Sequence, residues 1–409
     1  MKDNNNSTTS NNPSPGPGPM GPGNSMGPNS GQTTSSSNIS KVEMGIKGAF
    51  RTMNSDYHSN YFDVNSQNWI YNNLTSNNFE YKEKILSAYS NYTNKIFDIG
   101  YQFGIRLEQA FTKSNQLTTN ENYENNYFSF FPSLYLTKTF ANTNELQFSY
   151  TRRINRPHTF MLNPFTDYSD QQNLRKGNSN LKPEYINSLE FSYMKYFSYL
   201  SASGSIFYRN VTDAINRIVN VVDSTTSIST FANISKSSSY GLEFVLSGSI
   251  TKWWSINGST SYSKTTVTGD NVAGGTNNSG DVLSAKLMSS FSFKDLFDFQ
   301  VSYFYSGKMV TAQGSMDPMQ VMDIAIKKDL FNKRASINLR ISDVLNTMKF
   351  AVTSTSSTFD YSFSRRRDSR AIFLTFTLRF GADPMNNQNK KTTDSNKENQ
   401  NDTRQSEDY

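Results

Sequence analysis

Apolar and polar side chains alternate strictly between Phe97 and Glu108. The apolar residues of this segment occupy every second position and are Phe97, Ile99, Tyr101, Phe103, Ile105 and Leu107. A period of two places all of them on one face of a β-strand, whereas a helix would spread them around its surface. The segment is also close to the length that a tilted strand needs to cross a bilayer. It therefore predicts a membrane-spanning strand with one face toward lipid.

The same alternation recurs along most of the chain. Strands are expected at 41–51, 61–71, 79–92, 97–108, 127–139, 145–154, 185–197, 200–212, 239–250, 253–267, 282–294, 297–305, 319–328, 335–344 and 370–380. Short connections alternate with long polar ones at 112–126, 155–184, 213–238, 268–281, 306–318 and 346–364. This rhythm predicts an all-β, antiparallel transmembrane β-barrel, with short turns in the periplasm and long loops outside the cell. On this scheme the last strand ends on the periplasmic side.

The composition agrees with a barrel whose strands have one wet face. Hydrophobic residues make up 35% of the chain and the mean hydropathy is −0.64, yet aromatic residues reach 14%. Lumen-facing polar residues would lower the average hydropathy while aromatic residues serve the lipid face and its interfaces. No stretch approaches the roughly 18 apolar residues of a spanning helix. On periodicity alone, a soluble β-sandwich with disordered ends remains the alternative.

Several classes of function lack the residues that they need. The chain has no cysteine and only two histidines, His58 and His158, so neither a zinc site nor a Ser-His-Asp arrangement is expected. No P-loop, dinucleotide fingerprint or nucleophile elbow is present. The net charge of +6 is spread out, without a basic block typical of a nucleic-acid surface. We therefore expect no enzyme activity, no metal site, no cofactor and no nucleic-acid partner.

Composition divides the chain into three parts. Residues 1–40 are rich in Asn, Ser, Pro and Gly, and residues 382–409 are rich in Asn, Lys, Asp and Glu. Both segments have too little apolar surface to offset the entropy of ordering and are expected to be disordered. Residues 41–381 form the barrel part. The segment Met1–Asn6 leads into polar residues rather than an apolar export segment, which indicates a fragment or a misassigned start.

Three motifs around the long connection at 155–184 carry a resemblance to a known family. They occupy Ser149–Pro157, Leu162–Phe165 and Gly177–Glu184. In this order they resemble the outer-membrane β-barrel family of Bacteroidetes TonB-dependent receptors. A fourth segment, Ile341–Thr347, is similar to the turn-proximal motif before the final loop of these receptors. The resemblance extends from Val42 to Gly381 and includes neither tail.

The resemblance implies a function for the complete protein. Transporters with a plugged lumen have about 22 strands, so about 15 predicted strands correspond to the C-terminal portion of such a barrel. The family's plug, energy-coupling box and export signal have no counterpart in the sequence. The resemblance implies capture of an unidentified substrate from outside, with import driven by TonB through the missing plug. Two alternatives stay open, namely a plugless barrel acting as an adhesin or assembly component, and a passive porin.

A group of basic residues is the candidate ligand site. Its members are Arg152, Arg153, Arg156, Arg175 and Lys176, at the start of and within the connection at 155–184. Guanidinium groups suit phosphate and carboxylate, so the group predicts an anion-binding mouth in an extracellular loop. The alternative is contact with lipopolysaccharide phosphates or solvent at the rim. The same two interpretations apply to Arg365, Arg366 and Arg367.

Aromatic residues near the strand ends suggest two further contacts. Phe376, Leu378 and Phe380 share one face of the last strand, and the resemblance implies that they form the signal that the barrel-assembly machinery reads. Clusters such as Trp253 and Trp254 predict interfacial girdles in contact with outer-membrane lipid. A ligand-stacking surface is the alternative for these clusters.

Overall fold

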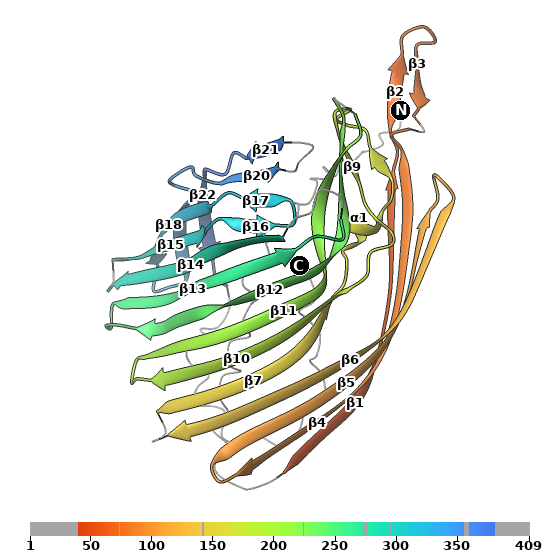
Figure 1. Ribbon diagram of the computed structural model, residues 1–409. Helices are drawn as coiled ribbons and strands as arrows, with labels where there is room; N and C mark the ends of the chain where they lie inside the picture. Colours follow the sequence, from red (N-terminus) through yellow and green to blue (C-terminus); the bar gives the residue numbers. More distant parts are fainter. Residues whose placement is uncertain are drawn as a thin grey trace.

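The computed structural model describes residues 40–380, apart from 73, 141–142, 224, 273–276, 295 and 356–359. Within these residues the chain forms strands almost throughout, and fourteen of them pair in series into one curved sheet (Figure 1). These fourteen are β1 (Lys41–Tyr57), β4 (Asn77–Ile96), β5 (Ile99–Gln116), β6 (Glu121–Phe140), β7 (Asn144–Asn155), β10 (Glu184–Tyr196), β11 (Leu200–Val221), β12 (Ser227–Ser249), β13 (Trp254–Thr268), β14 (Asn277–Phe293), β15 (Phe297–Ser306), β18 (Met319–Leu330), β19 (Ala335–Ser342) and β22 (Ala371–Leu378). The all-β antiparallel architecture predicted from the sequence is confirmed.

Smaller elements occupy the connections. They are β2 (Asn60–Asp63), β3 (Asn68–Tyr71), α1 (Thr159–Leu162), β8 (Thr166–Asp167), β9 (Asn173–Lys176), β16 (Met309–Thr311), β17 (Gly314–Met316), β20 (Lys349–Thr355) and β21 (Asp360–Arg366). β8 pairs with β9, which joins the upper part of β12, and β16, β17, β20 and β21 form a separate sheet. None of the described helices is both long and apolar enough to span a membrane.

The two ends of the sheet differ in their connections. Successive strands are antiparallel, so the short connections after β4, β6, β10, β12, β14 and β18 all lie at one end, which we call the turn end. The other end, the loop end, carries the small elements (Figure 1). β1 begins near the turn end, where Lys41 lies opposite Thr93. β22 ends there, where Leu378 lies opposite Ala335. The alternation of short and long connections is thus reproduced in space.

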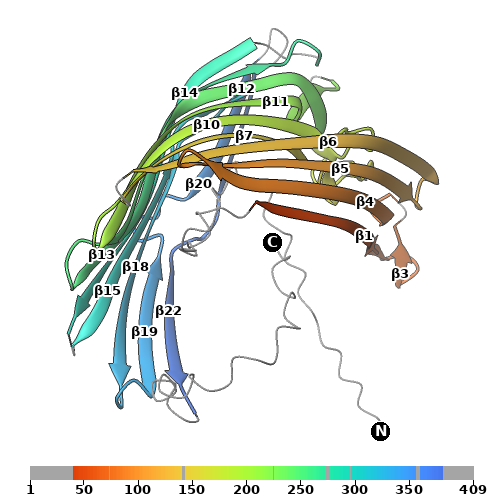
Figure 2. The ribbon, with the colours of Figure 1, turned by 90° about the horizontal axis from the view of Figure 1, so that it is seen from below.

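The two faces of the sheet differ in polarity. Pairing places Ile46, Phe103 and Phe191 on the same face as other apolar residues, and all three are exposed. The opposite face carries Glu83 and Glu108, against which the α1 segment packs through Arg156. Since this segment lies within the curve of the sheet, the polar face is the inner one (Figure 2). An exposed apolar outer face and a polar inner face are the pattern of a transmembrane barrel wall.

The sheet has two unpaired edges among the described residues. The series begins at β1 and ends at β22, and Figure 2 shows these strands at opposite sides of an open arc. Backbone N–H and C=O groups along an unpaired edge find no water in hydrocarbon. Each backbone group left without a hydrogen bond in hydrocarbon costs roughly several kcal/mol. The described sheet is therefore a barrel wall that requires further strand pairing.

Two expectations need correction. The segment 61–71 is not a wall strand, because β2 and β3 form a separate hairpin. Asp63 accepts hydrogen bonds from the backbone N–H groups of Asn65 and Ser66 and turns the chain back. The series therefore has fourteen strands rather than about fifteen. The connections at 112–126 and 213–238 are also mostly strand, since β5–β6 and β11–β12 continue far beyond the predicted bounds.

The buried core lies at the loop end. One cluster joins Phe79 and Tyr81 of β4 with Met161, Leu162, Leu181 and Phe231. A second cluster consists of Ala214, Ile234, Val267 and Ala312. Ile99 and Phe103, in contrast, are exposed on the outer face. The loop end is thus packed like a small soluble protein. The exposed apolar side chains of the wall, in contrast, must be covered by its surroundings. The predicted disordered segments 1–40 and 382–409 lie outside the described residues, apart from Ser40.

Candidate functional site

The connection between β7 and β10 is held against the inner wall by its own motif residues. Gly177 donates its N–H to Asn163 O at 2.9 Å, and Asn178 donates to Met161 O at 2.6 Å. A Cβ on Gly177 would lie 2.3 Å from Asn163 O, so only glycine fits this close approach. The side chain of Asn178 reaches Phe231 O at 2.9 Å and ties the connection to β12. The second and third motifs therefore fold against each other.

Two further residues anchor the end of this connection. Glu184 is buried, accepting hydrogen bonds from Asn155 Nδ2 at 2.6 Å and from the N–H of Ile215 at 2.5 Å. Asn233 exchanges hydrogen bonds with the backbone of Lys182, at 2.8 and 2.9 Å. These contacts join β7, β10, β11 and β12, so the connection is a fixed part of the loop end.

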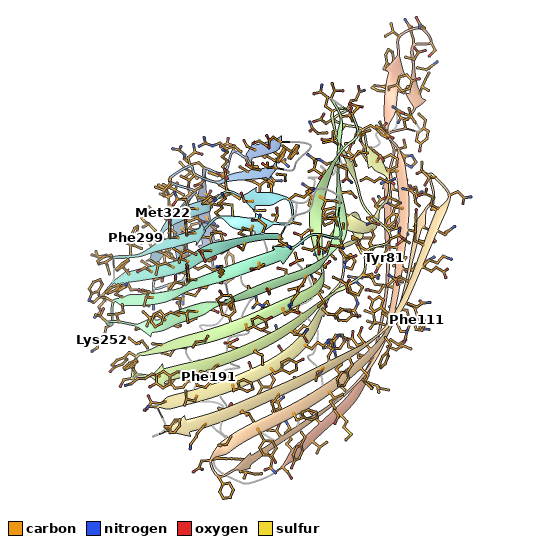
Figure 3. All side chains as sticks on the ribbon, viewed as in Figure 1. Tyr81, Phe111, Phe191, Lys252, Phe299 and Met322 are labelled. Atoms are coloured by element: carbon orange, nitrogen blue, oxygen red, sulfur yellow. The ribbon has the colours of Figure 1, made fainter. Side chains whose placement is uncertain are left out.

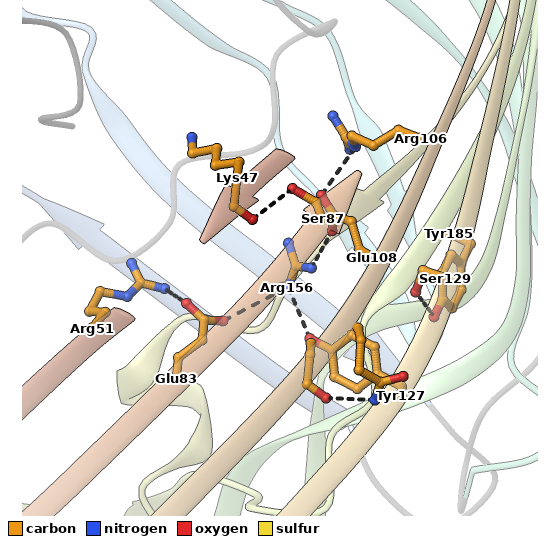
Figure 4. Close-up of polar contacts among 12 residues, drawn as sticks. Lys47, Arg51, Glu83, Ser87, Arg106, Glu108, Tyr127, Ser129, Arg156 and Tyr185 are labelled. Atoms are coloured by element: carbon orange, nitrogen blue, oxygen red, sulfur yellow. Dashed lines mark hydrogen bonds and ion pairs between the residues drawn. The ribbon is translucent and has the colours of Figure 1, made fainter. Parts of the chain in front are cut away.

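Arg156 is the centre of an ionic network on the inner face (Figure 4). Its guanidinium donates to Glu108 Oε2 at 2.7 Å and to the Tyr127 hydroxyl at 2.9 Å, and lies 3.8 Å from Glu83 Oε1. Arg51 approaches Glu83 at 2.6 Å, and Arg106 approaches Glu108 at 3.1 Å. Three wall strands, β4, β5 and β6, thereby contact the connection that follows β7, and Arg51 links β1 to them through Glu83.

The two carboxylates of the network and Arg156 are largely buried, whereas the side chains of Arg51 and Arg106 are about half exposed. The side chains of Glu83 and Glu108 are only 6% and 10% exposed, so each carboxylate needs a cationic partner. Burial of Arg156 lowers its pKa, but the hydrogen bonds to Glu108 and Tyr127 outweigh this effect and raise the pKa overall. Three guanidinium groups face two carboxylates, which leaves one positive charge in excess. Arg156 therefore works as an internal anchor.

A second group of ionisable residues lines the inner face farther along the sheet. Glu243, Lys286 and Asp323 lie on β12, β14 and β18 around a groove of about 500 Å³. Asn257, Ser259 and Ser302 complete its polar side, and Arg340 pairs with Asp323 at 2.6 Å. Both signs of charge and several neutral donors are available here. Such a groove can contact a polar molecule at the inner wall.

The segment Ile341–Thr347 forms a compact node. The carboxylate of Asp343 accepts hydrogen bonds from the N–H groups of Thr347 and Met348 at 3.0 and 3.1 Å and from the Ser369 hydroxyl. The N–H of Asp343 donates to Asp323 at 2.9 Å. Burial raises the pKa of Asp343, but these hydrogen bonds outweigh it and hold the pKa below its ordinary value. This motif residue joins β18, β19 and the start of β22.

Comparison with known proteins identifies the family to which this barrel wall belongs. The sequence matches the outer membrane protein beta-barrel family over residues 30–380. The chain belongs to this family. It lies in the outer membrane of a Gram-negative bacterium. No curated protein sequence matches the chain significantly.

Solved structures resemble the family member in fold at low sequence identity. A copper transporter, OprC, matches with a TM-score of 0.56 at 14% identity, over 82% of this chain and 53% of its own. The ferric citrate transporter FecA matches with a TM-score of 0.56 at 13% identity, over 83% and 52%. The siderophore receptor PiuA from Acinetobacter baumannii matches with a TM-score of 0.57 at 14% identity, over 83% and 53%. The chain thus spans about half the length of these structures.

The five predicted basic residues occupy different environments. Arg156 lies in the network described above, and the guanidinium of Arg152 lies 5.1 Å from the centre of the Tyr185 ring. Arg153 is exposed on β7, and Arg175 and Lys176 are exposed on β9. Nothing in the structure holds all five around one point. The predicted anion-binding role of the group stays a prediction.

The aromatic segments lie at the turn end. Phe376, Leu378 and Phe380 are exposed, and Phe376 is opposite the outer-face residue Ile337. Near the turns after β12 and β14, stacked or tilted rings join neighbouring strands, at centroid distances of 5.9 Å for Trp254–Phe291 and 5.0 Å for Phe293–Phe297. Their predicted roles, in assembly and in an interfacial girdle, stay predictions.

Sequence reasoning missed the partners of Arg156. The alternation from Phe97 to Glu108 places Glu108 on the polar face of its strand, but nothing in the sequence links Glu108, Glu83 or Tyr127 to the connection after β7. The pairing of β4, β5 and β6 puts these three residues beside one another, and Glu83 precedes Arg156 by 73 residues. One signal was available for Glu83, which stands between Tyr81 and Ile85 on the same face of its strand. Among the described residues no group of three or more His, Asp or Glu side chains could hold a metal ion.

Proposed function

We propose that the chain forms fourteen of the roughly 22 wall strands of a TonB-dependent outer-membrane importer, of the type found in Bacteroidetes, for a substrate that remains to be identified. The observation that supports this most directly is the match of the wall to solved transporters and receptors over more than four fifths of this chain. The named proteins handle copper, ferric citrate and siderophores. A plug and the remaining wall strands would complete the pore, and TonB would act through the plug.

The two ends of the sheet fit this role when the loop end faces outward. Barrels of this class place long connections outside the cell and short turns in the periplasm. The exposed residues Arg153, Arg175 and Lys176 would then form an anion-binding mouth at the entrance. The groove beside Glu243, Lys286 and Asp323 would lie on the inner wall below them. No enzyme activity is needed for this function.

Uptake by cells tests the proposal. A strain lacking the gene, and the same strain carrying the complete gene, would be given labelled ferric chelates, copper, cobalamin, peptides and oligosaccharides. We expect accumulation of one class only with the gene, abolished by a protonophore. Gene-dependent entry that persists with the protonophore would indicate a passive porin. Loss of surface attachment without any uptake defect would indicate an adhesin. Either result would overturn the proposal.

A further inference from the structure

Two arginines at the loop end lie on one face of neighbouring strands. Arg217 of β11 lies directly opposite Phe231 of β12, and Arg175 of β9 lies opposite Ser229 of the same strand. Because Ser229 and Phe231 are two residues apart, all four side chains share one face. Figure 1 shows β9 beside the ends of β11 and β12. We call Arg175 and Arg217 the arginine pair.

The loop-end core fixes the position of Arg217. Its guanidinium lies 5.6 Å from the centre of the Phe231 ring. Phe231 belongs to the buried cluster that also contains Tyr81 and Leu162, and Figure 3 labels Tyr81 of this cluster. The side chain of Arg217 is nevertheless exposed. The core therefore holds in place a positive charge that solvent and dissolved molecules can reach.

The small sheet of β16, β17, β20 and β21 approaches Arg217 as well. Gln313, between β16 and β17, accepts a hydrogen bond from the N–H of Val219 at 2.8 Å and donates one to Val219 O at 3.2 Å. This contact joins the small sheet to β11 two residues beyond Arg217. Tyr361 of β21 lies near enough to act on the charge of Arg217. A tyrosine hydroxyl is therefore available near the guanidinium.

The arginine pair has no bound counter-charge. Neither guanidinium forms a hydrogen bond or an ion pair with another described residue. The carboxylates of Asp167 and Asp170, in the same connection as Arg175, instead accept hydrogen bonds from backbone N–H groups of their own turns, at 2.9 and 3.0 Å. Although solvent reaches Arg217, the surrounding elements limit its hydration and lower its pKa, and the charge of Arg175 lowers the pKa further. An anion beside the pair would relieve this repulsion.

Arg209, farther along β11, shows the usual compensation. It lies two residues from Phe207, which is opposite Glu190 of β10. Glu243 of β12 follows on the same face. Side chains two residues apart along a strand share a face, so Arg209 has two carboxylates on its own face. The missing counter-charge is therefore a local feature of Arg217.

We infer that the arginine pair binds an oxyanion group, a carboxylate or a phosphate, of an organic molecule. Guanidinium forks match the oxygen atoms of both groups. An organic anion fits better than a free inorganic one because the ring of Phe160, which packs edge-on against Phe231 at 5.8 Å, is 51% exposed. The inference deepens the proposed function and rests on it for the arrival of the ligand from outside. The substrate class of the importer is then an anion that also carries an apolar part.

Binding of small anions to the full-length protein in lipid nanodiscs tests the inference. Isothermal titration calorimetry would compare phenyl phosphate and benzoate with inorganic phosphate, which has the charge alone, and with benzyl alcohol, which has the ring alone. Arg217→Gln should bind the two aromatic anions at least about tenfold more weakly, because a hydrogen bond to a charged group contributes at least this factor. Arg175→Gln should have a smaller effect in the same direction. The matched variant Arg209→Gln should bind as the wild type does.

Further outcomes separate loss of charge from loss of fold. Arg217→Lys keeps the charge without the planar fork and should bind more tightly than Arg217→Gln and more weakly than the wild type. Equal binding of benzoate and benzyl alcohol, or an equal effect of Arg209→Gln, would overturn the inference. Binding of inorganic phosphate as tightly as phenyl phosphate would show a free-anion site instead of a site for an organic ligand. None of these measurements depends on uptake, so failure of the proposed transport function would be recognised separately.

Discussion

The wall near the turn end and the packed region at the loop end differ in where their apolar side chains lie. Phe103 in the wall is 46% exposed, whereas Phe79, on the neighbouring strand near the loop end, is 1% exposed. The wall needs lipid to cover its outer face, because water would contact its aromatic band. The loop end has its own core and hydrogen-bond networks. One continuous sheet therefore has two regions that are stabilised in two different ways. The membrane stabilises the wall, and the chain's own core stabilises the loop end.

Truncation of one phenylalanine in each region should separate the two kinds. Phe79→Ala removes a fully buried ring from the loop-end core and should cost about 3–5 kcal/mol. Phe103→Ala removes a lipid-facing ring and should cost less. Hydrogen exchange of the full-length protein in lipid nanodiscs would measure this as lost protection in residues 155–184 for the first variant only. Equal loss of protection in both variants would contradict the comparison.

Two glycines offer a second, smaller contrast. A Cβ on Gly177 would meet Asn163 O at 2.3 Å and Met161 O at 2.7 Å, whereas a Cβ on Gly204 in the wall meets nothing within 4 Å. Gly177→Ala should therefore destabilise the loop end by about 1–3 kcal/mol, and Gly204→Ala should be close to neutral. Protease cleavage within residues 155–184 would report the difference. Resistance of the Gly177 variant at wild-type levels would show that this contact can relax freely.

Acid should weaken the Asp343 node and leave the wall intact. The folded pKa of Asp343 is lowered, so its stabilisation is complete above the unfolded value of about 3.9 and is lost as the pH falls through the folded pKa. Hydrogen exchange between pH 7 and pH 3 should show lost protection in residues 343–355 before the wall strands. Asp343→Asn should reduce protection at pH 7 and remove most of its pH dependence. An unchanged pH profile would assign the effect to other groups.

The wall was predictable because one physical rule governs it. Lipid on one side and a polar lumen on the other force an alternation, as at Ile99, Tyr101 and Phe103. Above the membrane both faces of a strand meet water or protein, and the alternation disappears. The residues 213–221 and 227–238 thus read as loop, although they continue β11 and β12. The hairpin β2–β3 was mistaken for a wall strand because its aromatic residues also satisfy a strand pattern.

The candidate site was less predictable than the wall. Basic residues around Arg156 suggested a ligand site, but the carboxylate partners of Arg156 precede it by 48 and 73 residues. A single sequence carries no record of such distances. The motif residues Gly177 and Asn178 carry the family resemblance, but the sequence does not show that Asn178 contacts Phe231 of β12.

The long pairing of β11 with β12 has a mechanical consequence. Their partners run from Leu200 opposite Gly248 at the turn end to Val221 opposite Ser227 at the far tip. This continuous backbone pairing joins the tip of the ribbon to the wall, so we expect the two strands to move together. A molecule that contacts the loop end at this tip would therefore act on both strands at once.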